Sequence, residues 1–84
     1  MPAKKFYTYI LLTINNKFYC GYTDDLEKRF ENHLNGKASK FTRANKPVKI
    51  VYSKEYLTKS EAMKEEYRIK KLTRCQKDKL IQAQ

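Results

Sequence analysis

Two runs of apolar residues near the start of the chain predict a β-hairpin. Residues 5–13 are rich in β-branched and aromatic side chains, and residues 17–22 repeat that character. The polar segment INNK separates them, and Asn15 and Asn16 suit the positive-φ positions of a tight hairpin turn. Strands joined by such a turn pair antiparallel.

The segment after the hairpin has the 3.6-residue periodicity of an amphipathic helix. We expect this helix to begin at a capping box of Asp24 and Glu27 and to run to about Asn35, before Gly36. Its apolar stripe, expected to face the core, consists of Leu26, Phe30 and Leu34.

The second half of the chain predicts one strand and two helices. After a polar, basic loop at 36–47, residues 48–57 begin as an alternating apolar strand. Two helices follow, over 58–72 and about 74–82, each opened by a capping box. The boxes pair Thr58 with Glu61 and Thr73 with Gln76. The order β-β-α-β-α-α predicts an α+β or mixed α/β domain, with helices covering one or both faces of a small sheet.

Length and composition predict one small basic domain, over residues 5–81 with short tails at 1–4 and 82–84. The net charge of +10 favours a polyanionic partner, DNA or RNA before an anionic membrane surface. The alternative is a lysine-rich, solvated surface. Two cysteines without a C-x-x-C pair and a single histidine argue against zinc and indicate reduced thiols in the cytoplasm. No segment is long enough to span a membrane.

Arg29 and His33 lie along one edge of the apolar stripe of the first helix. They are four residues apart and therefore stacked neighbours. We expect both to point toward the rim of the sheet, near Tyr19 and Gly21 on one face of the return strand. A glycine inside a strand indicates a bulge or a close approach by another group. The alternative for Arg29 and His33 is ordinary packing along an amphipathic edge.

Glu66 lies within the expected apolar arc of the second helix, with Lys70 next to it. That arc consists of Ala62, Met63, Tyr67, Ile69 and Leu72. A carboxylate in such a position is costly unless it is paired, hydrogen-bonded or metal-bound. Two interpretations remain open: a carboxylate held in a cleft, or a structural ion pair with Lys70 or Arg29.

Phenol, guanidinium, imidazole and one carboxylate in a basic domain suit phosphodiester hydrolysis. A tyrosine could act as base, an arginine could stabilise the developing charge, and lysines could hold the strand. A two-metal nuclease requires several clustered acids, which the sequence does not present. A single Mg²⁺ ion held by one carboxylate and waters fits better.

These residues and their order resemble the GIY-YIG nuclease domain over about residues 5–81. The matching segments are Tyr7-Thr8-Tyr9, Tyr19-Cys20-Gly21, Arg29 and His33 within DDLEKRFENH, and Glu66 within SEAMKEEY. The chain is more narrowly similar to small stand-alone bacterial members, with stretches such as GKASKFTR, PVKIVY and EYRIKKL. The first motif departs from the family pattern as Tyr-Thr-Tyr, and Cys20 replaces an isoleucine.

The resemblance implies a three-stranded antiparallel sheet flanked by helices and metal-dependent cleavage of duplex or branched DNA, in repair or recombination. It implies that Tyr9 and Tyr19 are the motif tyrosines, one of them the base, that Arg29 stabilises charge and that His33 assists proton transfer. It makes Glu66 the sole protein ligand of Mg²⁺, or alternatively Mn²⁺.

Without a second domain, DNA must bind to this core and no protein partner is implied. Phosphate contacts are expected from Lys28, Lys37, Lys40 and Arg43, unless the loop is simply solvated. The prediction is an endonuclease that is structure-dependent or weakly sequence-specific. The alternative is a non-catalytic DNA- or RNA-binding module on the same fold.

Overall fold

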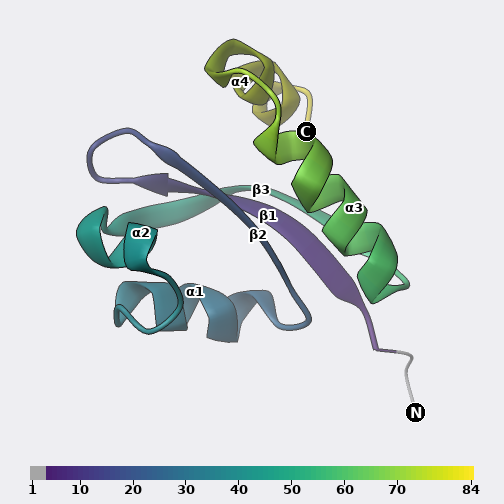
Figure 1. Cartoon of the computed structure of the whole chain (residues 1–84), viewed down its shortest axis with the longest axis horizontal. Coiled ribbons are helices and arrows are strands. Elements are labelled where there is room, and N and C mark those ends of the chain that lie inside the picture. Colours follow the sequence, from purple (N-terminus) through teal and green to yellow (C-terminus); the bar gives the residue numbers. More distant parts are fainter. Residues whose placement is uncertain (1–3) are drawn as a thin grey trace.

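A three-stranded antiparallel sheet forms the centre of the protein (Figure 1). The computed structural model describes residues 4–84. The strands are β1 (Phe6–Thr13), β2 (Phe18–Thr23) and β3 (Pro47–Tyr56), in the spatial order β2-β1-β3. The expected hairpin and the antiparallel sheet are confirmed. Because β1 is central, β2 is one free edge of the sheet.

Helices cover both faces of this sheet. They are α1 (Leu26–Leu34), α2 (Lys40–Ala44), α3 (Lys59–Lys70) and α4 (Arg74–Gln82). Figure 1 shows α1 and α2 on one side of the sheet and α3 and α4 on the other. The predicted order is confirmed, with the short α2 added inside the expected loop. Within residues 4–84, no helix is long and apolar enough to cross a membrane.

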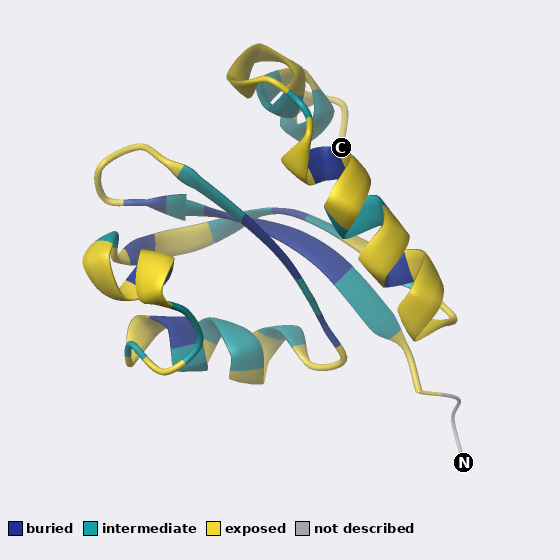
Figure 2. Cartoon of the chain, viewed as in Figure 1, coloured by how far each residue is buried: buried dark blue, intermediate teal, exposed yellow. Residues whose placement is uncertain are grey.

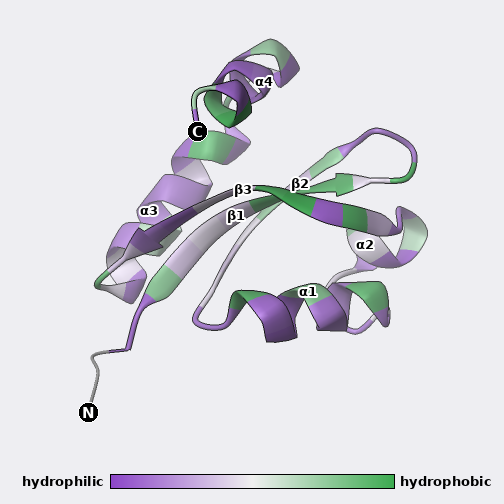
Figure 3. Ribbon diagram, turned by 180° about the vertical axis from the view of Figure 1, so that it is seen from behind, coloured by the Kyte–Doolittle hydropathy of each residue, from purple (hydrophilic) through white to green (hydrophobic). Residues whose placement is uncertain are grey.

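The core is divided between the two faces of the sheet. On one face, Ile10, Cys20 and Tyr52 pack against Ile69 of α3. Figure 2 shows that burial is concentrated along the strands, and Figure 3 shows that α3 is mostly hydrophilic. A sheet of this size therefore supplies most of the apolar surface, and each helix contributes only a few buried side chains.

The apolar stripe expected on α1 is partly wrong. Leu26 and Phe30 are half-buried, but Leu34 is 41% exposed. The buried residue of α1 is His33, which is only 1% exposed. A helical wheel places the imidazole at the edge of the apolar stripe, whereas in the folded protein it is the most buried side chain of α1.

The arc expected on α3 is also narrower than predicted. Ala62 and Ile69 are fully buried, whereas Met63 and Tyr67 are exposed. Glu66 is half-buried, so its predicted inward position is borne out. α3 packs against all three strands, but only a narrow stripe of the helix is buried.

The structure differs from the prediction at the cap of α1 and in the hairpin turn. The N-cap of α1 is Asp25, whose carboxylate accepts from the Lys28 amide, and the box at Asp24 does not form. Asp24 instead forms an ion pair with Lys4. In the hairpin turn only Asn16 has positive φ.

The remaining caps follow the expected pattern in part. Thr58 caps α3 by accepting from the Glu61 amide, but the Glu61 carboxylate bonds to the Thr58 hydroxyl instead of completing the expected box. The box of Thr73 with Gln76 forms at α4 as predicted. Gly36 has a φ of 72° directly after α1, as expected for a residue that ends a helix.

Candidate active site

A small pocket of about 160 Å³ brings four of the five predicted catalytic and metal-binding residues together. It lies at the β2 edge of the sheet and takes side chains from β1, β2, α1 and α3. The residues lining it are Tyr9, Tyr19, Gly21, Tyr22, Arg29 and Glu66. Residues separated by up to 57 positions in the sequence therefore converge on one concave surface.

The pairing register of β1 and β2 brings the tyrosines to the α1 face. Tyr9 lies opposite Gly21, and Leu11 lies opposite Tyr19. Because side chains alternate along a strand, these four positions share one face. A Cβ atom on Gly21 would lie 2.5 Å from Tyr9 Oη, which is too close for any side chain. Gly21 therefore marks a close approach rather than a bulge, and the approaching group is the Tyr9 ring.

His33 lies directly behind the pocket and does not line it. Its Nε2 atom is hydrogen-bonded to Tyr9 Oη at 2.8 Å, and its Nδ1 atom to Thr42 Oγ1 at 2.7 Å. The Tyr19 ring meets the imidazole edge-on, with centroids 5.0 Å apart. Burial, assisted by the Arg29 guanidinium, lowers the pKa of His33 to about 4. His33 is therefore a neutral, doubly hydrogen-bonded imidazole at neutral pH.

Tyr9 is a buried phenol whose proton is held tightly. Burial raises the pKa of Tyr9 above its ordinary value, and the neighbouring Tyr19 adds to this effect. The positive charge of Arg29 acts in the opposite direction but does not cancel burial. A free Tyr9 phenolate is consequently disfavoured in this site, and any reaction that uses Tyr9 must give its proton a destination.

The short helix α2 supports this arrangement, and sequence reasoning missed it. Its N-cap, Ser39, accepts a hydrogen bond from the Thr42 amide, which places Thr42 against His33. Phe41 stacks on Tyr19 with ring centroids 5.8 Å apart. The available signal was Ser39, a residue type preferred at helix N-caps, but it stands inside a segment rich in lysine.

Glu66 enters the pocket from α3 and is already paired with a cation. Its side chain is 17% exposed, and Oε1 lies 2.7 Å from Lys70 Nζ. The Glu66 carboxylate in turn raises the pKa of Lys70. The main-chain carbonyl of Glu66 accepts a weak hydrogen bond from the Cys20 thiol at 3.8 Å, which connects α3 to β2. The sequence left two alternatives for Glu66, an ion pair within the helix and a carboxylate held in a cleft. The structure shows both, because Glu66 pairs with Lys70 and also lines the pocket.

The donor set at this pocket suits a hydrated hard cation. Glu66 is the only acidic residue that lines it. Within residues 4–84 no group of three or more His, Cys, Asp and Glu side chains could hold an ion. One carboxylate oxygen with open space beside it fits Mg²⁺ or Mn²⁺, which retain water ligands, and does not fit zinc.

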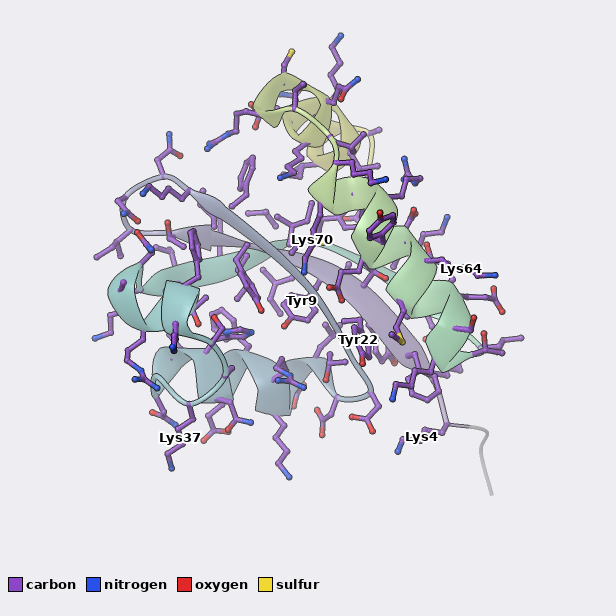
Figure 4. The ribbon with its side chains drawn as sticks, viewed as in Figure 1. Lys4, Tyr9, Tyr22, Lys37, Lys64 and Lys70 are labelled. Atoms are coloured by element: carbon purple, nitrogen blue, oxygen red, sulfur yellow. The ribbon has the colours of Figure 1, made fainter. Side chains whose placement is uncertain are left out.

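The predicted phosphate-binding residues lie away from the pocket floor. Lys28 is exposed on α1, Lys37 is exposed between α1 and α2, and Lys40 is exposed at the first residue of α2. Figure 4 shows Lys37 at the lower edge of the molecule, beyond the end of α1. Arg43 is also exposed, but its Nε donates to the Gly36 carbonyl, so this cation also stabilises the turn after α1.

Comparison with known proteins agrees with the resemblance noted in the sequence. A family model described as the GIY-YIG catalytic domain matches residues 5–79. A UPF0213 protein of Oceanobacillus iheyensis is 49% identical, covering 93% of this chain and 91% of that protein. A UPF0213 protein of Bacillus velezensis is 44% identical, covering 98% and 83%.

A solved structure matches the fold as well. The solution NMR structure of a UPF0213 protein from Bacillus halodurans aligns with a TM-score of 0.62 and 36% identity, covering 95% of this chain and 85% of that one. The names of these relatives state no activity, so the function must be argued from the site.

Proposed function

Because this chain belongs to the GIY-YIG family, we propose that it is a metal-dependent endonuclease that hydrolyses phosphodiester bonds of DNA. The observation that carries the proposal is the single pocket in which two tyrosines, an arginine and one carboxylate meet. This is the set that phosphodiester hydrolysis requires: a base, a fixed positive charge and a ligand for a divalent ion.

Glu66 is proposed to hold the ion, Mg²⁺ or Mn²⁺, through a carboxylate oxygen. When bound, the ion would neutralise phosphate charge and support the leaving oxygen. Arg29 lines the same pocket and offers a guanidinium to the additional negative charge of the transition state. A fixed guanidinium needs little reorganisation during the reaction, so its contribution is realised mainly in the transition state.

The hydrogen bond between Tyr9 and His33 gives the proton of the buried Tyr9 phenol an acceptor. In the tautomer with its hydrogen on Nδ1, His33 donates to Thr42 and accepts the Tyr9 hydrogen at Nε2. Tyr9 Oη can then take a proton from the attacking water while its own proton passes to Nε2. No free phenolate has to exist, which agrees with the raised pKa of Tyr9. His33 becomes a transient imidazolium against its lowered pKa, and the negative charge of the attacked phosphate is proposed to stabilise it. Tyr19, on the same pocket, is the alternative base.

Substrate binding is proposed to use the positive surface rather than base contacts. The chain carries ten more positive than negative charges, and Lys28, Lys37 and Lys40 are exposed around α1 and α2. Contacts of this kind position the phosphate backbone and carry little sequence information. We therefore propose a structure-dependent or weakly sequence-specific enzyme.

The test is cleavage of branched, nicked and plain duplex DNA in Mg²⁺ by the wild type and by Glu66→Gln and Arg29→Ala. Loss of one transition-state contact is expected to slow cleavage by about 100-fold or more. Glu31→Gln and Lys64→Ala serve as controls, because both residues are exposed, lie outside the pocket lining and have no proposed contact with DNA.

Three results would count against the proposal. They are no cleavage by the wild type, cleavage that survives both pocket substitutions, and equal losses in the control variants. DNA or RNA binding that needs no divalent ion and is unaffected by Glu66→Gln, without cleavage, would assign the protein to the rival class of binding modules.

A further inference from the structure

The ammonium of Lys70 contacts the same carboxylate that the proposed reaction assigns to a metal ion. Lys70 Nζ lies 2.7 Å from Glu66 Oε1, four residues along the same helix. Figure 4 labels Lys70 and Tyr9 in the space between α3 and α1. A cation therefore already stands beside the only acidic side chain of the pocket.

We propose that Lys70 takes the place of the divalent ion at Glu66 in the metal-free protein and is displaced when the ion binds. This inference rests on the proposed metal-binding role of Glu66. A half-buried carboxylate without a partner is costly, and the Lys70 ammonium removes that cost while no metal is present. Lys70 thus stabilises the half-buried carboxylate of Glu66, but it also competes with the ion for that carboxylate.

Both cations cannot share the carboxylate in the same geometry. A divalent ion would lie about 2.1 Å from a carboxylate oxygen. An ammonium that remained on Oε1 would then face a doubly charged ion at close range, and like charges at that distance repel strongly. With no second carboxylate lining the pocket, nothing offsets this repulsion. Binding of the ion to the free protein would therefore weaken or replace the pair with Lys70.

Lys70 is free to leave and has a partner to move to. Its side chain is 52% exposed and lies at the last residue of α3, on a flexible four-carbon stem. The phosphate of a bound strand would bring negative charge to the same pocket. Lys70 would then exchange the carboxylate for the phosphate, so that binding of metal and of substrate assist each other.

The test is the affinity of the free protein for Mn²⁺, measured by electron paramagnetic resonance without DNA. Lys70→Met keeps the apolar stem and removes the competing charge. We expect it to tighten Mn²⁺ binding about two- to fivefold, the upper part of the range that the strength of a partly exposed ion pair implies. Lys70→Arg keeps a cation on the carboxylate, so its affinity is expected to equal or fall below that of the wild type.

Lys71→Met is the matched control. It removes the same charge from the adjacent position, but the Lys71 ammonium lies over the Tyr67 ring, 4.2 Å from its centroid. An unchanged affinity in Lys71→Met, beside a tighter Lys70→Met, supports the proposal. Equal tightening in both variants would reveal only a general charge effect and would overturn it, as would no tightening in Lys70→Met.

Glu66→Gln separates this inference from the proposed function. If Glu66→Gln binds Mn²⁺ as tightly as the wild type, the metal role of Glu66 fails and both proposals fall. If Glu66→Gln abolishes binding while Lys70→Met binds like the wild type, the metal site stands and only the role of Lys70 is refuted.

Discussion

Acidification from pH 7 to pH 5 is expected to destabilise this protein through its single histidine. His33 is 1% exposed and lies between Tyr9 and Thr42. Its pKa is about 4 in the folded chain, against 6.5 ordinarily. The unfolded chain therefore binds the proton more readily, so the stabilisation is complete above pH 6.5 and is lost as the pH falls toward 4.

The size of the effect follows from the shift in the pKa of His33. Linkage between values of 6.5 and about 4 gives a loss of about 2 kcal/mol in the free energy of unfolding between pH 7 and pH 5. For a domain of this size that loss lowers the melting temperature by about 8–15 °C. The carboxyls of Asp24 and Glu65 have lowered pKa values, so they remain ionised over this interval.

The assay is urea unfolding at several pH values, with the His33 titration followed by NMR. Because the chain has one histidine, its imidazole signal needs no further assignment. His33→Gln is the control, since an amide cannot be protonated in this range and should show a flat stability profile. The reasoning is refuted if the wild type loses less than about 0.5 kcal/mol, or if His33→Gln loses as much as the wild type.

Three further predictions concern packing, hydrogen bonding and charge. Gly21→Ala places a Cβ against the Tyr9 hydroxyl and should cost about 1–3 kcal/mol in urea unfolding; an unchanged midpoint would contradict the close approach. Thr42→Val leaves His33 Nδ1 without a partner and should cost about 1–3 kcal/mol, and Thr42→Ser should restore most of it; equal midpoints for the Val and Ser variants would exclude the bond. Lys40→Gln should reduce the slope of log affinity against log salt on duplex DNA by about 0.9, and an unchanged slope would show that Lys40 makes no phosphate contact.

Sequence periodicity predicted only part of which helix residues are buried. Periodicity correctly indicated that Glu66 faces inward on α3, but it also placed Met63 and Tyr67 in the core, where they are exposed. A helical wheel gives the direction of each side chain relative to its neighbours. It does not give the width of the surface that covers the helix, and a sheet of three strands covers only a narrow stripe.

The basic loop after α1 was the largest omission. A run of lysines and polar residues suggested a loop that either contacts phosphate or is solvated, yet it contains α2, with Thr42 hydrogen-bonded to His33. A helix of five residues is too short to be stable alone. It forms here because contacts with His33 and Tyr19 hold it, and such contacts leave no periodic trace in the sequence.

The sequence by itself determined the hairpin, the order of the longer elements and the residue types of the site, because turn residues, caps and periodicity act over a few neighbouring positions. Only the tertiary structure decided that Gly21 makes room for Tyr9, that His33 lies behind the pocket, and that Lys70 stands at the carboxylate of Glu66. The register between β1 and β2 and the packing of α1 and α3 across the sheet edge produce these contacts. They join residues that are distant along the chain, and local patterns carry no information about such distances.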